Sequence, residues 1–213
     1  QLIYTRIDRN RANQPRFRSQ YLRVDADEYF NPASMVKLPV AILALEKLNQ
    51  LKKYGINRNS TMLTDSSCCR QTPVLADTSA ADGKPSIAHY IKKIFIVSDN
   101  DAYNRLYEFV GQETINRRLQ EMGYMQSRIT RRFVSMNEEE NRHTNPIRFL
   151  DAEGKLLFHQ LPAYNPQPFD FSRKIFIGNA HYDRNDSLIH RPMDFTTHNN
   201  MPLDHLRLML QSV

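Results

Sequence analysis

Two short polar motifs constrain this chain more than any other feature of its sequence. Ser34 and Lys37 stand three residues apart at the start of an apolar-striped segment, and Ser98-Asp99-Asn100 follows much later. Residues three apart on a helix share one face, with Cβ atoms roughly 5–6 Å apart, so the Lys37 amine can reach the Ser34 hydroxyl. We therefore expect a fold in which a helix carrying the first motif packs beside a turn carrying the second.

The residue types in these motifs suit acyl transfer. A serine hydroxyl is a weak nucleophile until a neighbouring base removes its proton, and a lysine can be that base only if its pKa is lowered. At a helix start, the Ser34 N–H can supply half of an oxyanion hole. Ser98 can relay a proton to the leaving nitrogen, and the Asn100 carboxamide can hold a substrate amide. Alone, each motif is an ordinary helix cap or turn; together they favour a catalytic site.

Hydrophobic periodicity predicts a mixed α+β chain that is mostly helical in its middle third. Aromatic residues at helical spacing, which we expect in the core, are Tyr90, Phe95, Tyr103, Tyr107 and Phe109. The predicted elements are strands at 1–9 and 16–24, a long helix at about 34–54 ending at Gly55, a helix after the N-cap Ser86, helices at 102–110 and 113–122, a β-hairpin joining 147–150 to 155–158, and a final helix after Pro202.

Composition shifts along the chain predict four segments. Residues 1–33 are expected to form N-terminal strands of an α/β part, and residues 34–136 a helical domain with both motifs. Residues 137–195 have several helix-breaking prolines and are expected to be an insertion with a β-hairpin. Residues 196–213 are expected to carry the last helix.

Net charge, apolar runs and the spacing of cysteines and histidines exclude several classes of function. The 213 residues carry a net charge of +6, but the basic residues are scattered and no zinc-finger or RNA-binding signature is present, so we expect no nucleic-acid partner. No apolar run approaches the roughly 18 residues of a membrane span. The adjacent Cys68 and Cys69 are predicted to be free thiols. The seven histidines lack metal-ligand spacing, so no metal site and no cofactor are expected.

The two motifs and their surroundings resemble the penicillin-recognising serine hydrolases, most closely the class A β-lactamases. The likeness covers roughly residues 1–135 and 196–213 and is carried by the runs 32–39 and 97–104, by an omega-loop-like start at 127–131, and by the helix after that loop at 196–209. By this resemblance Ser34 is the acylated nucleophile and Lys37 is its base. Ser98 is then the proton shuttle, and Asn100 is a substrate-binding group.

The sequence departs from that family in ways that bear on activity. Phe133 stands two residues after the omega-loop arginine, Arg131, where the family has a glutamate; Glu138, Glu139 and Glu140 follow just downstream as possible substitutes. The Lys-Thr-Gly strand is absent. We therefore expect an incomplete β-lactamase/transpeptidase-like sheet whose C-terminal part lies outside this chain, which would be an N-terminal portion of a longer protein and impaired in isolation.

The leading hypothesis is a β-lactamase-like serine hydrolase, periplasmic or secreted, forming an acyl-serine intermediate with β-lactams or peptidoglycan D-alanyl peptides. The alternative is a catalytically silent member of the fold that binds cell-wall peptide or a partner protein. A third possibility, prompted by the +6 charge, is a surface that binds anionic envelope polymers.

Overall fold

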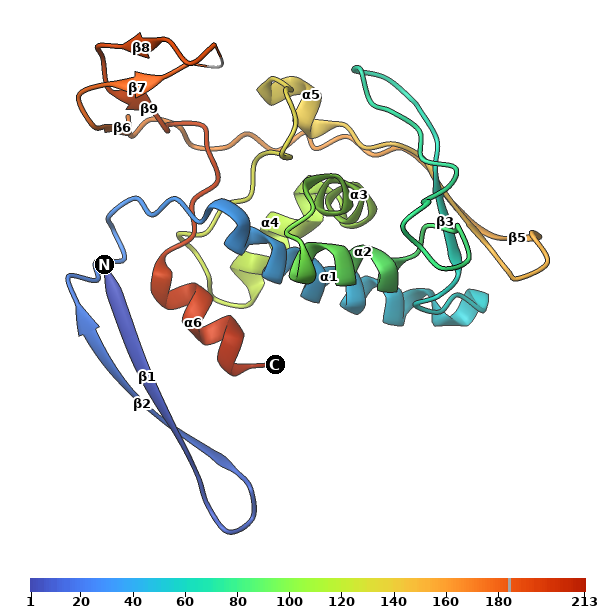
Figure 1. Cartoon of the computed structure of the whole chain (residues 1–213), viewed down its shortest axis with the longest axis horizontal. Helices are drawn as coiled ribbons and strands as arrows, with labels where there is room; N and C mark the ends of the chain where they lie inside the picture. The colour runs from blue at the N-terminus through green and yellow to red at the C-terminus, as the bar shows by residue number, and fades with distance from the viewer. Residues whose placement is uncertain (184) are drawn as a thin grey trace.

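Four helices form the centre of this computed structural model, which describes residues 1–183 and 185–213. They are α1 (Lys37–Leu51), α2 (Ile87–Ile96), α3 (Asn100–Val110) and α4 (Gln112–Glu121). Figure 1 shows α3 seen end-on among the other three, and every residue of α3 from Ala102 to Val110 is buried. The predicted α+β class with a helical middle third is therefore confirmed.

The helix boundaries follow from local sequence signals. The predicted long helix runs as a 3₁₀ turn (Ala33–Val36), α1, and a second 3₁₀ turn (Lys52–Tyr54) that ends at Gly55, whose φ of +77° suits glycine. The Ser86 side chain accepts a hydrogen bond from the His89 N–H and so caps α2 as predicted. These signals were readable from the sequence because they depend on neighbouring residues.

A three-stranded antiparallel sheet packs against the helices. Strands β4 (Ile147–Leu150) and β5 (Leu156–Gln160) form the predicted hairpin, and β3 (Thr61–Thr64) pairs with the other edge of β4. The rings of Phe149 and Phe109 meet edge to face with centroids 5.5 Å apart, which joins this sheet to α3. The strand β3 was not predicted, since it lies in a polar, turn-rich stretch.

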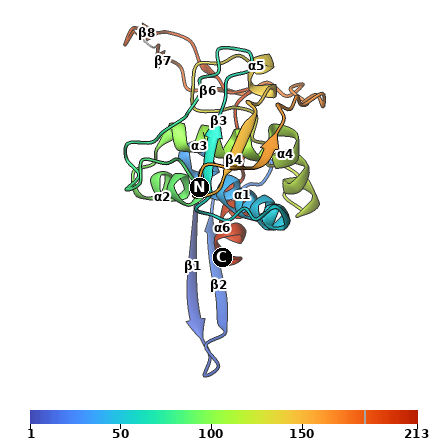
Figure 2. The same cartoon turned by 90° about the vertical axis from the view of Figure 1, so that its right-hand side faces the viewer.

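The N-terminal hairpin extends away from the helical layer, as Figures 1 and 2 show. Its strands, β1 (Leu2–Arg9) and β2 (Pro15–Leu22), pair antiparallel with Leu2 opposite Leu22. Helix α6 (Leu203–Gln211) contacts β1, and the Arg207 guanidinium lies over the Tyr21 ring. That the hairpin belongs to a larger sheet, with a C-terminal part outside this chain, stays a prediction.

The segment between α4 and α6 is mostly irregular. It includes α5 (Glu138–Arg142), which a capping box of Asn137 and Glu140 begins. Two small sheets lie at one end of the molecule (Figure 1). They pair β6 (Phe176–Ile177) with β9 (Met193–Asp194), and β7 (His181–Tyr182) with β8 (Leu188–Ile189).

Two sequence-based predictions are wrong. Phe95 is 56% exposed rather than part of the core, because it lies at the solvent-facing end of the apolar stripe of α2. Cys68 and Cys69 are bonded to each other rather than free thiols. Their turn places Cys69 and Arg70 at positive φ, and the Gln71 N–H donates to the Cys68 carbonyl, a local conformation that the sequence did not indicate. None of the described helices is long and apolar enough to cross a membrane.

Candidate functional site

The structure brings together all four side chains singled out from the sequence. The Lys37 Nζ donates to Ser34 Oγ at 3.1 Å, to Ser98 Oγ at 2.9 Å and to Asn100 Oδ1 at 2.9 Å. It also contacts the backbone carbonyl of Ser98. The Ser98 hydroxyl donates to Ser34 Oγ at 3.1 Å, so the two hydroxyls and the amine form one connected cluster.

Two helix starts hold this cluster in place. Ser34 lies in the 3₁₀ turn that leads into α1, and Lys37 is the first residue of α1, so the spacing of three places them on one face. Ser98 lies between α2 and α3, and Asp99 caps α3 by accepting from the Ala102 N–H at 2.8 Å. The hydrogen bonds from Lys37 to Ser98 and Asn100 show that the turn between α2 and α3 faces the start of α1.

The backbone is strained on both sides of the cluster. Ala33, which precedes the candidate nucleophile, has a φ of +42°, and Ser98 has a φ of +54°. Residues other than glycine rarely adopt such backbone conformations. Each residue that does so costs on the order of 1–3 kcal/mol, which the surrounding packing must offset. Both strained residues lie at the point where the two motifs meet, which is typical of a functional site.

The electrostatics suit a lysine base. The Lys37 side chain is only 2% exposed, whereas Ser34 is exposed to solvent. Burial lowers the pKa of Lys37, and the nearby charge of Asp99 partly opposes this by raising it. A lowered pKa increases the fraction of neutral amine at a given pH, and only the neutral amine can accept the Ser34 proton.

Phe133, two residues after Arg131, lies beside the Lys37 amine. Its ring centroid lies 5.3 Å from Lys37 Nζ and 4.8 Å from the Tyr103 ring. The Phe133 N–H donates to Asn104 Oδ1 at 2.8 Å, which fixes this segment to α3. An apolar ring, rather than a carboxylate, therefore lies next to the Lys37 amine.

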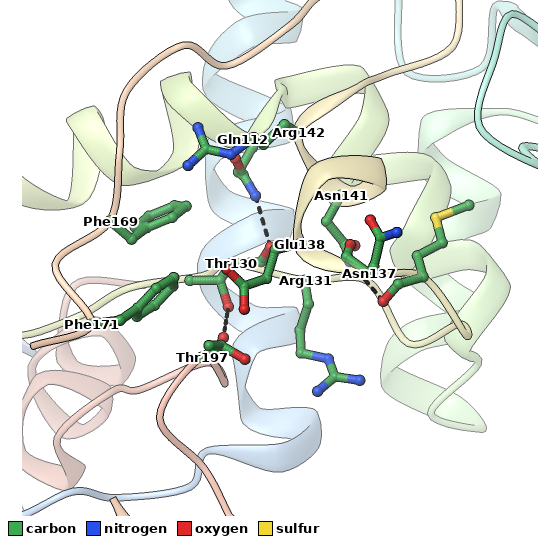
Figure 3. A pocket seen from close by; sticks show the side chains of 11 residues that line it. Gln112, Thr130, Arg131, Asn137, Glu138, Asn141, Arg142, Phe169, Phe171 and Thr197 are labelled. Carbon is green, nitrogen blue, oxygen red and sulfur yellow. Dashed lines mark hydrogen bonds between the residues drawn. The ribbon is translucent and has the colours of Figure 1, made fainter. Parts of the chain in front are cut away.

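The three downstream glutamates are engaged elsewhere. Glu139 pairs with Arg142 and His143, and Glu140 closes the capping box and binds Arg70. Glu138 lines a separate cavity of about 210 Å³, shown in Figure 3. Among the described residues, no hydrogen bond or ion pair joins any of the three to the Ser34 cluster.

The cavity in Figure 3 lies between the segment around Thr130 and α5. Gln112 Nε2 donates to the Thr130 carbonyl at 2.7 Å, and Thr130 Oγ1 donates to the Thr197 carbonyl at 2.8 Å. Its other walls include Asn137, Arg142 and two phenylalanines, Phe169 and Phe171. These contacts tie together segments that are distant in sequence and so position the stretch that carries Phe133.

A soft-metal site is not formed in this structure. The side-chain donor atoms of Cys68, Cys69 and His143 lie within 4.8 Å of one another. However, the two sulfurs are bonded to each other, and metal binding by cysteine needs thiolates.

Sequence reasoning missed a second set of site residues. A cavity of about 500 Å³ borders the Ser34 cluster, and its walls include Arg131 and His198. Burial and the charge of Arg131 lower the pKa of His198 to about 4. No sequence signal could have found this cavity, because its lining comes from separate parts of the chain that only the fold brings together.

Comparison with known protein families supports the family resemblance described in the sequence analysis. The model of the beta-lactamase enzyme family matches residues 16–157, which is well over half of the chain. The chain belongs to the beta-lactamase enzyme family. Both motifs of this beta-lactamase family member, and the departure at Phe133, lie inside the matched range. Searches of curated proteins and of solved structures found no match. The family resemblance inferred from the sequence is thereby confirmed, and a β-lactamase-like hydrolase function is supported.

Proposed function

We propose that this protein is a serine acyl-transfer enzyme that forms an acyl-Ser34 intermediate with β-lactams or D-alanyl peptides of peptidoglycan. The observation that carries the proposal is the contact of one buried amine, Lys37 Nζ, with Ser34 Oγ, Ser98 Oγ and Asn100 Oδ1. Such substrates belong outside the cytoplasmic membrane, so the proposal includes a periplasmic or secreted location.

Each of the four side chains has a role in the acylation step. Neutral Lys37 accepts the Ser34 proton as Ser34 Oγ forms a bond to the acyl carbon. The Ser34 N–H, at the first turn of the helix, stabilises the oxyanion that develops. The carbon–nitrogen bond then breaks, and the Ser98 hydroxyl delivers a proton to the leaving nitrogen and is reprotonated from Lys37. The product is an ester on Ser34; the new amine departs when the donor is a peptide and stays attached to the opened ring when the donor is a β-lactam, with Asn100 holding an amide of the substrate.

The fate of the ester depends on the base that would activate water. A positioned general base contributes roughly 10²–10⁴ in rate, and Phe133 cannot act as one. We propose that hydrolysis of acyl-Ser34 is slow and that the intermediate persists, as in a penicillin-binding protein rather than an efficient antibiotic-destroying enzyme.

Labelling with a fluorescent penicillin tests the proposal. We expect covalent label on wild-type protein, located at Ser34 by peptide mass spectrometry. Ser34→Ala is expected to abolish the label, and Lys37→Met to slow labelling by at least 10²-fold. Ser172→Ala, an exposed serine outside the site, is the matched control and keeps full labelling. Absence of label on the wild-type protein, or label on another residue, contradicts the proposal.

A further inference from the structure

The cavity of about 500 Å³ lies directly beside the Ser34 cluster, on the side of Asn100. Three lining residues join it to the cluster: Ala33 precedes Ser34, Asn100 contacts Lys37, and the Phe133 ring lies near Lys37 Nζ. Its remaining walls include Arg131, Arg132, His198 and Asn199. A donor whose amide binds Asn100 therefore places its acyl substituent in or next to this cavity.

The lining is cationic and carries no carboxylate among the residues that the structure describes. Arg132 does not account for this charge, since its guanidinium lies 3.6 Å from Glu108 and contacts the His143 carbonyl. His198 does not account for it either, because its pKa of about 4 leaves it neutral at pH 7. Arg131 is therefore the residue that gives this cavity its positive charge.

The backbone of Arg131 is fixed while its guanidinium is left unpaired. The Arg131 N–H donates to Asn199 Oδ1 at 3.1 Å, and its carbonyl accepts from the Tyr103 hydroxyl at 3.2 Å. Within residues 1–183 and 185–213, no carboxylate pairs with the guanidinium. Figure 3 shows the Arg131 side chain directed away from the Glu138 carboxylate. A cation whose backbone is held in place and that has no carboxylate partner among the described residues is well placed to bind an anionic ligand.

We propose that this cavity binds the acyl substituent of the donor and that Arg131 binds a carboxylate on that substituent. The proposal rests on the acyl-Ser34 function for the orientation of the donor. Guanidinium and carboxylate match in shape and can form two parallel, charge-assisted hydrogen bonds. The cavity volume also lies within the range of about 300–1,000 Å³ typical of small-molecule sites. The preferred substrates are thus acyl donors with an anionic side group, such as acidic peptides.

Equilibrium binding to the Ser34→Ala variant tests this without requiring any chemistry. The two probes are N-succinyl-D-alanyl-D-alanine and N-butanoyl-D-alanyl-D-alanine, which differ by a carboxylate in place of a methyl group on the acyl side. We expect the succinyl peptide to bind about tenfold more tightly at pH 7. In the double variant that carries both Ser34→Ala and Arg131→Gln, we expect no preference for the succinyl peptide. The control Arg11→Gln, which removes one positive charge at the tip of the hairpin, retains it.

A second measurement uses protein with Ser34 intact. Penicillins with and without a carboxylate on the acyl side chain are compared for their rate of acylation. Arg131→Gln is expected to slow only the carboxylated penicillin, by about tenfold. Equal affinity for the two peptides, no binding of either, or an equal loss of both acylation rates in Arg131→Gln overturns the inference. A succinyl preference without any acylation supports this site and contradicts the proposed acyl-Ser34 function instead.

Discussion

Replacing Phe133 with glutamate places a negative charge beside the candidate base. The ring centroid of Phe133 lies 5.3 Å from Lys37 Nζ. At about this distance, and with an effective dielectric constant of about 20, opposite unit charges attract by about 3 kcal/mol. One pKa unit corresponds to 1.36 kcal/mol, so the interaction could raise the pKa of Lys37 by about 2 units. Solvent that reaches the exposed Ser34 screens part of this attraction, and we therefore expect the pKa of Lys37 to rise by about 1–2 units.

The consequence is a displaced pH profile of acylation. In the proposed mechanism only neutral Lys37 acts as the base, so the acylation rate rises with pH through the pKa of Lys37. Raising that pKa moves the rising limb to higher pH by about 1–2 units. At a pH below both limbs, acylation becomes about 10–100-fold slower, and it recovers at alkaline pH.

Stopped-flow acylation with a fluorescent penicillin from pH 5 to 10 measures this limb. Phe133→Gln is the matched control, because it removes the same ring contacts with Tyr103 and Lys37 but adds no charge. Rising limbs that coincide for the glutamate and glutamine variants would refute the assignment of Lys37 as the base covered by Phe133.

The remaining predictions concern stability and covalent state. The pKa of His198 is lowered to about 4 in the folded protein, so between about pH 6.5 and 4 the unfolded chain binds the extra proton and stability falls with falling pH. Discounted for partial exposure, the loss in the free energy of unfolding is about 1–2 kcal/mol. Urea unfolding of His198→Gln should lack this part of the pH dependence. A pH dependence identical to that of the wild-type protein would contradict the prediction. Ser86→Ala removes the cap of α2 and should cost about 0.5–2 kcal/mol in the same assay; an unchanged midpoint would show that the cap contributes nothing. Denatured protein treated with iodoacetamide should gain mass only after reduction, because Cys68 and Cys69 are bonded; alkylation without reductant would disprove the bond.

The arrangement of the four motif residues was predictable because it depends on short-range geometry. A spacing of three at a helix start places Lys37 beside Ser34 whatever the rest of the fold does. Asp99 caps the following helix as such residues commonly do, and that cap places Ser98 in the turn. The only long-range step was that this turn faces the start of α1, which the pairing of two specific motifs indicated.

The cavity next to that cluster was not predictable, for a physical reason. Its lining comes from residues near 31, 100, 131–135 and 195–199, which no periodic pattern links. The bond between Cys68 and Cys69 depends on positive φ at Cys69 and Arg70, which no glycine signals in the sequence. Phe95 was assigned to the core because helical periodicity identifies a stripe but not the point at which the stripe leaves the neighbouring helix.

Phe133 bears on two steps of the proposed reaction, the activation of Ser34 by Lys37 and the later hydrolysis of the ester. The Phe133 ring shields the Lys37 amine from water, and such burial lowers the pKa of the amine, whereas the face of the ring also attracts the ammonium form and opposes that shift. By standing where the resemblance implies a glutamate, Phe133 leaves the proposed mechanism without the group that would activate water for release of the acyl group. In the proposed mechanism, the substitution therefore slows hydrolysis of the ester. An enzyme that keeps its ester in this way is suited to passing its acyl group to an incoming amine, or to retaining it, rather than to rapid turnover with water.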